Sequence, residues 1–242
     1  MNWIGPSIAA LFFLQGAAWA AAEKEDLPGS HGREKYRYEA VPIGGEAGRK
    51  ELTEITLIDA DRGVEYISKN ISPEDIEEIT IHTDREGRFI SGLRTTSSRQ
   101  NEKVQQEKIW IADRKAYLER GTGEEKKRKE YELPQDTPFA VDGSLLVLLR
   151  SFPFNQGKEW NVFMLDFSGY SIQVTIRQTG MEKVAVPAGE FECYRIEVVV
   201  DIPIFHPKVT YWLSVRKPNF LVKHQGKKGP FTPSYVTSLV SF

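Results

Sequence analysis

The chain has 242 residues, of which 40% are hydrophobic and 27% charged, and its 32 basic residues nearly balance 34 acidic ones, leaving a formal net charge of −2. This balance excludes a strongly basic nucleic-acid binder, and ample apolar content with low net charge excludes an intrinsically disordered chain. A single cysteine excludes an intramolecular disulfide and any zinc site built on several cysteines.

The first segment of the chain differs from the rest because residues 1–22 contain no Asp, Glu, Lys or Arg. An apolar run over residues 8–14 precedes the small-x-small sequence Ala18-Trp19-Ala20, an order typical of a secretory signal peptide. A transmembrane anchor needs about 20 consecutive apolar residues, and Gln15 ends the run too early. We therefore expect residues 1–20 to be a signal peptide and the protein to be exported, periplasmic in a Gram-negative bacterium, with no transmembrane anchor after signal cleavage.

Residues 21–34 carry charges, glycines and a proline with almost nothing to bury, which predicts a flexible lead-in. From residue 35 to residue 242 the chain reads as a single β-rich domain. Apolar and polar residues alternate most clearly over residues 170–177 and 194–200, and this period of two is typical of strands with one buried face. Noisier runs of the same kind cover residues 36–41, 52–58, 76–82, 89–93, 109–112, 160–167, 209–215, 220–224 and 235–242.

Turn sequences rich in glycine, proline, asparagine and aspartate separate these runs, among them Thr179-Gly180 and Pro187-Ala188-Gly189. Short strands without long helical crossovers predict an all-β, mainly antiparallel fold whose sheet must hide its edges. We expect a β-barrel or a strongly curved half-barrel. The charged run over residues 124–130 is interpreted as a solvated hairpin tip or a strand edge, because its charges nearly cancel.

Two segments interrupt the strand pattern. Ser72-Pro73-Glu74-Asp75 combines a capping serine, a proline and carboxylates, which predicts a single helical turn. Asp142-Gly143-Ser144 precedes five consecutive aliphatic residues, 145–149, and a helix that is apolar all round must be buried. We expect one short buried helix near residues 142–150, capped by Asp142, that lies across the concave face and closes one end of the barrel.

No pattern of catalytic or metal-binding residues emerges from the motifs. The four histidines are scattered, and His224 is expected opposite Thr210 in a hairpin, far from the others. Pairs of acidic residues are numerous, and Glu190 and Glu192, which share one face of a strand, are an example that a hydrolase could use as acid and base. Cys193 has no nearby histidine and is interpreted as a structural, partly buried thiol. The sequence thus predicts no enzyme, no cofactor and no metal site.

Two groups of residues are candidates for binding. The first consists of aromatic residues that either contact a ligand or fill the core: Tyr194, Tyr211, Trp212 and Trp160. The second is a set of six basic residues in a segment, from residue 202 to the end, that contains no acidic residue: Lys208, Arg216, Lys217, Lys223, Lys227 and Lys228. Such a basic patch suits anionic lipid or an acidic partner, although neighbouring acidic strands could equally neutralise it.

The segment Val186-Pro187-Ala188-Gly189-Glu190-Phe191, the strand that follows it and the later Tyr211-Trp212-Leu213-Ser214 resemble the bacterial exported proteins grouped as domain of unknown function 3108. Asp142-Gly143-Ser144 with the aliphatic run after it, and Phe152-Pro153-Phe154, resemble the same family's apolar segment. The resemblance covers residues 133–242. It implies an exported, β-rich protein and supplies no catalytic residues.

The leading hypothesis is a non-enzymatic envelope protein that binds a hydrophobic ligand, a lipid or a lipoprotein on a curved sheet. The alternatives are a scaffold or interaction component of a cell-envelope complex, and a hydrolase that depends on carboxylates. The state of the concave face separates the first two, since an open apolar cavity supports a carrier and a filled one supports a scaffold.

Overall fold

The computed structural model describes residues 32–43, 50–100, 103–121, 126–200, 207–227 and 234–242. The predicted signal peptide lies outside these residues. Fifteen strands and one short helix follow one another along the described chain. They are β1 (Arg33–Pro42), β2 (Glu51–Ala60), β3 (Gly63–Ile71), β4 (Asp75–Thr83), β5 (Phe89–Ser98), β6 (Val104–Ala112), β7 (Lys115–Arg120), β8 (Lys127–Glu132), β9 (Phe139–Val141), α1 (Ser144–Leu149), β10 (Glu159–Leu165), β11 (Ser171–Val186), β12 (Gly189–Val200), β13 (Lys208–Ser214), β14 (Leu221–Lys227) and β15 (Ser234–Ser241).

All fifteen strands belong to one sheet, in the order β8-β7-β6-β5-β4-β3-β2-β1-β15-β14-β13-β12-β11-β10-β9. Consecutive strands pair antiparallel as hairpins, and the pairing of β1 with β15 joins the N-terminal half of the sheet to the C-terminal half. The exception is β9, which runs parallel to β10. The all-β, mainly antiparallel class is therefore confirmed.

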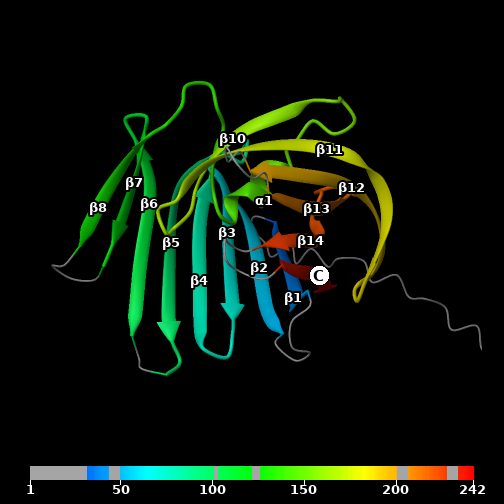
Figure 1. The fold of residues 1–242 in the computed structure, drawn as a ribbon, viewed down its shortest axis with the longest axis horizontal. Helices are drawn as coiled ribbons and strands as arrows, with labels where there is room; N and C mark the ends of the chain where they lie inside the picture. Colours follow the sequence, from blue (N-terminus) through cyan, green and yellow to red (C-terminus); the bar gives the residue numbers. More distant parts are fainter. Residues whose placement is uncertain (1–31, 44–49, 101–102, 122–125, 201–206, 228–233) are drawn as a thin grey trace, which may run out of the picture.

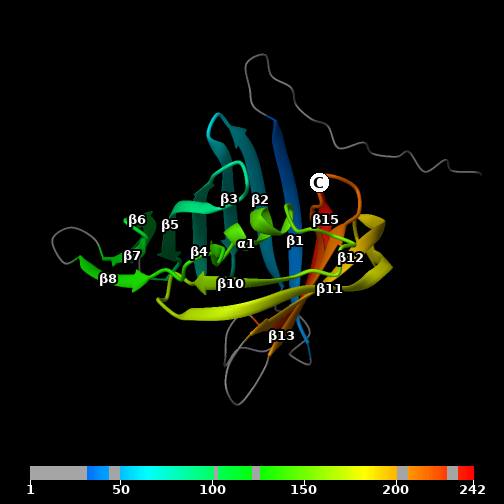
Figure 2. The ribbon, with the colours of Figure 1, turned by 90° about the horizontal axis from the view of Figure 1, so that it is seen from above.

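The two halves of the sheet curve toward each other around α1, as Figures 1 and 2 show. Phe89 on β5 meets Phe139 on β9 edge to face, with ring centroids 5.5 Å apart, so the C-terminal end of the sheet packs onto the inner face of the N-terminal half. Of the two predicted forms, a β-barrel or a strongly curved half-barrel, the closed barrel is wrong, because β8 and β9 are the two ends of the sheet and do not pair. The two edge strands differ in their exposure: β9 is completely buried, whereas β8 is exposed and charged.

The predicted buried helix is confirmed as α1, whose leucines and valine pack in the core. Its predicted cap is wrong, since the residue before the helix is Gly143 and no side chain caps the helix start. Asp142 instead has a φ of 32° and accepts a hydrogen bond from the backbone N–H of Phe167 at 3.4 Å. Ser144, the first residue of α1, instead bonds to the strand before the helix: its Oγ accepts a hydrogen bond from the backbone N–H of Val141 at 2.7 Å.

Three other expectations need correction. The segment from Ser72 to Asp75 is the tight connection between β3 and β4 and not a helical turn, although Ser72 Oγ accepts the N–H groups of Glu74 and Asp75 at 3.2 and 3.0 Å as a capping serine would. Thr179-Gly180 lies inside β11 as a bulge, where the register with β12 shifts by one residue. The lead-in ends earlier than predicted, because β1 begins at Arg33 and pairs with β2 from that residue.

Candidate functional site

The concave face of the sheet is filled. Leu149, Phe167 and Val141 reach zero exposure between the two halves, and α1 occupies the space between them. A void beneath α1 measures about 20 Å³, and Tyr36, Tyr66 and Asn219 are among the residues that line it. A void of that size holds about one water molecule, whereas pockets for drug-sized ligands measure roughly 300–1,000 Å³.

Of the predicted aromatic residues, Tyr194 and Trp160 pack against the segment that follows α1. Tyr194 stacks on Phe154 with ring centroids 4.1 Å apart and an interplanar angle of 12°. Trp160 meets Phe152 edge to face at 5.1 Å. Both rings are therefore already engaged in intramolecular aromatic contacts and partly buried against the core.

Trp212 and Tyr211 are neighbours on β13. Trp212 is 8% exposed, and its indole N–H donates to a carboxylate oxygen of Glu182 at 2.6 Å, so a buried ring keeps its single donor satisfied. Tyr211 lies 4.8 Å from the ring of His224, and burial raises the pKa of its hydroxyl. The predicted opposition of His224 and Thr210 is off by one residue, because a bulge in β14 shifts the register after Trp212.

The predicted basic patch separates into two groups. Lys208 lies at the start of β13, near the end of β14 where Lys227 is, and forms an ion pair with Glu197 at 3.5 Å. Arg216 and Lys217 lie in the turn between β13 and β14, which at ~3.3 Å per residue is about 25 Å from Lys208. Lys223 lies between them, with its Nζ 4.9 Å from the centre of the Trp212 ring. Lys228 lies outside the described residues.

The carboxylate pair and the thiol occupy positions that do not form a site together. Glu190 and Glu192 are both exposed on β12, and Glu190 forms an ion pair with Lys183 at 3.3 Å across the hairpin. Cys193 is completely buried, and burial raises the pKa of its thiol to about 12. Within the described ranges, no group of three or more histidine, cysteine or acidic residues is placed to hold a metal ion.

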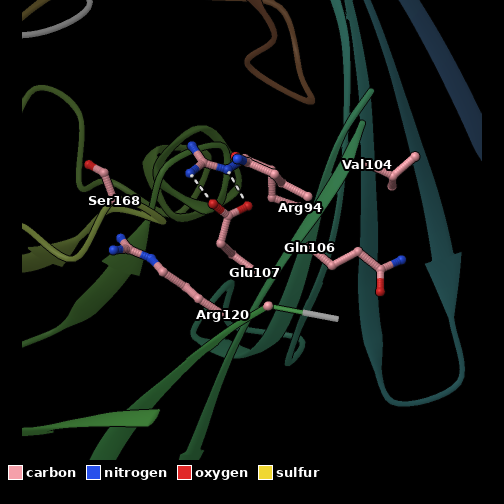
Figure 3. A pocket seen from close by; sticks show the side chains of 8 residues that line it. Arg94, Val104, Gln106, Glu107, Arg120 and Ser168 are labelled. Carbon is pink, nitrogen blue, oxygen red and sulfur yellow. Dashed lines mark hydrogen bonds and ion pairs between the residues drawn. The ribbon is translucent and has the colours of Figure 1, made fainter. Parts of the chain in front are cut away.

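A cleft that the sequence analysis did not identify lies where β5, β6, β7 and β8 meet the turn between β10 and β11. Two depressions, of about 430 and 240 Å³, lie on either side of Arg120 and share Arg120 and Ser168. Figure 3 shows the larger depression, with Arg94 facing Glu107 and Arg120 beside them. We call the two depressions together the Arg120 cleft.

The turn that covers the cleft is held by side chains from β7 and β8. Arg120 donates from Nε and Nη2 to the carbonyl oxygen of Phe167 at 3.2 and 2.6 Å. Tyr131 donates its hydroxyl to the carbonyl oxygen of Gly169 at 2.8 Å. Gly169 has a φ of 83°, and a Cβ there would lie 2.8 Å from that hydroxyl oxygen, so the close approach requires glycine.

Charged residues line up across four neighbouring strands beneath this turn. Arg94, Glu107, Arg120 and Lys127 lie directly opposite one another on β5, β6, β7 and β8. Arg94 donates to both carboxylate oxygens of Glu107 at 3.2 Å and lies 3.7 Å from Glu77. Burial opposes the charge on Arg94, but these carboxylates outweigh it and raise its pKa. Arg120 and Lys127, nearer the edge, have no carboxylate partner among the described residues.

Asp142 lies under the same turn, and the pKa of its carboxyl group is raised. Burial, and then the nearby charge of Asp166, raise its pKa from 3.8 to about 7, and the N–H of Phe167 and the charge of Arg94 only partly oppose this rise. Asp142 does not line the Arg120 cleft. The cleft itself therefore offers cationic donors, which suit an anionic group, and no pair of carboxyl groups of unlike pKa.

No protein-family model matches the chain, and a search of curated proteins finds no significant match. Among solved structures, the chain is similar to a Bacteroides fragilis protein whose description assigns it, provisionally, to the exported proteins and to a YmcC-like fold. The alignment covers 87% of this chain and 95% of that one at 10% identity, with a TM-score of 0.34. Among the described residues no helix is long and apolar enough to cross a membrane.

Proposed function

We propose that this is an exported, non-enzymatic protein of the cell envelope that acts by binding another envelope protein at its surface. The single observation that carries the proposal is the filled concave face. The sheet encloses α1 and a tightly packed aromatic and aliphatic core, and the void beneath α1 has room for about one water molecule. A curved sheet that is already filled offers its outer faces and its edge to partners.

Export and a periplasmic location are proposed on the sequence of residues 1–20, whose uncharged apolar run and Ala18-Trp19-Ala20 are typical of a cleaved signal. The proposed resemblance of residues 133–242 to domain of unknown function 3108, if it holds, implies export as well. Among the described residues, the void beneath α1 is too small for the ligand of a carrier, and the larger depression of the Arg120 cleft is lined mainly by charged and polar residues. The hydrolase alternative could use carboxylates such as Glu190 and Glu192, which are exposed and line neither depression of the Arg120 cleft.

Crosslinking in cells, followed by purification in detergent, tests this role. We expect one protein neighbour to be captured reproducibly and to persist after lipid is stripped away. Native mass spectrometry of the purified protein provides the control, with an expected mass free of lipid. Co-purified lipid together with lipid transfer between vesicles would contradict the proposal and favour a carrier.

A further inference from the structure

The outermost strand of the N-terminal half, β8, offers an open edge. It pairs with β7 on one side, all of its residues except Tyr131 are exposed, and no described element lies beyond it in Figure 1. The other end of the sheet differs, because β9 is completely buried. A new strand can therefore add to the described sheet at β8, where main-chain groups remain available.

The register shows which backbone groups face outward. Leu133 donates its N–H to the carbonyl oxygen of Arg114 at 3.2 Å, so this pair marks a hydrogen-bonded position of the β7–β8 ladder. Hydrogen-bonded and non-hydrogen-bonded pairs alternate along an antiparallel ladder. The N–H and C=O groups of Arg128, Glu130 and Glu132 therefore point away from β7, toward the open edge.

The cleft beside this edge is cationic. Its smaller depression is lined by Arg120, Lys127, Arg128 and Lys129 together with neutral residues, and by no acidic residue. Arg128 lies 4.1 Å from the centre of the Tyr117 ring, which fixes its guanidinium against the outer face of the sheet. None of these four cations forms an ion pair within the part of the chain that the structure describes.

The carboxylates on β8 do not neutralise this depression. Glu130 and Glu132 contact Lys115 at 3.4 and 3.0 Å, near the far end of the strand. Lys126, just before β8, contacts Glu119 at 2.7 Å. Among the described residues of this run, 126–130, the ion-paired Lys126 and Glu130 are thus engaged away from the depression, and Arg120, Lys127 and Lys129 line it without an ion-pair partner among the described residues.

We propose that β8 accepts an extended, acidic segment of a partner protein as an additional strand, with carboxylates of that segment in the Arg120 cleft. The inference rests on the proposed interaction role and names the chemistry of the partner. Outward backbone groups supply the affinity common to any added strand, and the cationic cleft selects acidic side chains from the partner.

A proline at the edge tests the main-chain part of this proposal. The Glu130→Pro variant removes one outward N–H but no hydrogen bond to β7, so the fold should tolerate it. The matched control, Glu130→Ala, removes the same side chain and keeps the N–H. The probe is a fluorescent peptide of alternating valine and glutamate, with binding followed by anisotropy. We expect Glu130→Pro to weaken binding about five- to tenfold, and Glu130→Ala to bind as the parent protein does or more tightly.

A pair of charge reversals tests the side-chain part. Lys127→Glu/Lys129→Glu should weaken binding of the acidic peptide at least about tenfold, and a peptide of alternating valine and lysine should then bind better than the acidic one. The control, Arg216→Glu/Lys217→Glu, makes the same change of charge in the turn between β13 and β14 and should change binding less than about twofold. Circular dichroism and thermal melting establish that all variants are folded.

Four outcomes would overturn the inference. Equal binding by Glu130→Pro and Glu130→Ala would mean that no strand is added, and equal losses from the two charge reversals would mean that only net charge matters. Vesicles containing phosphatidylglycerol are tested in parallel, and binding to them that depends on Lys127 and Lys129 while the peptide does not bind would assign the cleft to anionic lipid. A neighbour crosslinked in cells that persists in Glu130→Pro would retain the proposed interaction role while refuting β8 as its site.

Discussion

Asp142 links the stability of this fold to pH in a way that one substitution can measure. Its carboxyl group lies partly buried beneath the turn between β10 and β11, and its pKa is about 7 against an ordinary value of 3.8. Because the folded state holds the proton more tightly, the stabilisation is complete below about pH 4 and is lost as the pH rises to about 7. The Asp142→Asn variant is neutral at every pH, and asparagine tolerates the φ of 32° found here.

The magnitude follows from the two pKa values. Each pH unit between them costs 1.36 kcal/mol, so the full loss is about 4 kcal/mol, of which about 1.5 kcal/mol has already occurred at pH 5. Relative to the parent protein, Asp142→Asn should therefore become more stable by about 2.5 kcal/mol between pH 5 and pH 8. Urea unfolding of both proteins at the two pH values measures this difference, and the titrating groups that do not interact with Asp142 cancel in the comparison. A stability difference that is the same at pH 5 and pH 8 would refute the reasoning.

Three further predictions concern the core, the charged row and the thiol. Leu149→Ala should lower the free energy of unfolding, measured in urea, by about 3–5 kcal/mol because this side chain of α1 is fully buried. Leu93→Ala, at an exposed position of β5, should lower it by less than about 0.5 kcal/mol. Similar losses in the two variants would contradict the packing described here. Arg94→Leu should lower the free energy of unfolding by about 3 kcal/mol or more, because it leaves the Glu107 carboxylate buried and unpaired. Adding Glu107→Leu should recover most of that loss. Additive losses in the double-mutant cycle would argue against coupling between the two side chains. Cys193 should resist Ellman's reagent at pH 8 until the protein unfolds, since a thiol with a pKa of about 12 is ionised in about one molecule in 10⁴; rapid labelling of the folded protein would show that it is accessible and ionised.

Alternation in the sequence located the strands whose inner side chains reach the core. Val174 and Ile176 are buried on β11, and Ile196 and Val198 are buried on β12, as the period of two indicates. The short helix was also predictable, because five aliphatic residues in succession leave no face for water. Both inferences depend only on neighbouring residues. Burial of one face of a strand gives an alternating pattern, and burial all around a helix gives a continuous apolar run, within a few residues of sequence.

The strand at the open end of the sheet, β8, shows no such apolar pattern in its sequence. The sequence of β8, Lys-Arg-Lys-Glu-Tyr-Glu, contains no aliphatic residue, and the charged run over residues 124–130 that overlaps it indicated only a hairpin tip or a strand edge. Near-cancelling charges in that run argued against a binding role. In the structure, Glu130 turns to Lys115 while Lys127 and Lys129 line the Arg120 cleft, so cancellation along the chain does not describe the local field.

The sequence by itself determined an all-β domain with one buried helix, because periodicity and composition report how each segment divides its side chains between water and core. Whether the curved sheet closes, what fills it, and where a partner can bind were decided only by tertiary structure. Those properties depend on contacts between distant segments, such as Arg120 with the carbonyl oxygen of Phe167, 47 residues away, and Phe89 with Phe139. The energy of such contacts depends on the curvature of the whole sheet, which no local pattern encodes.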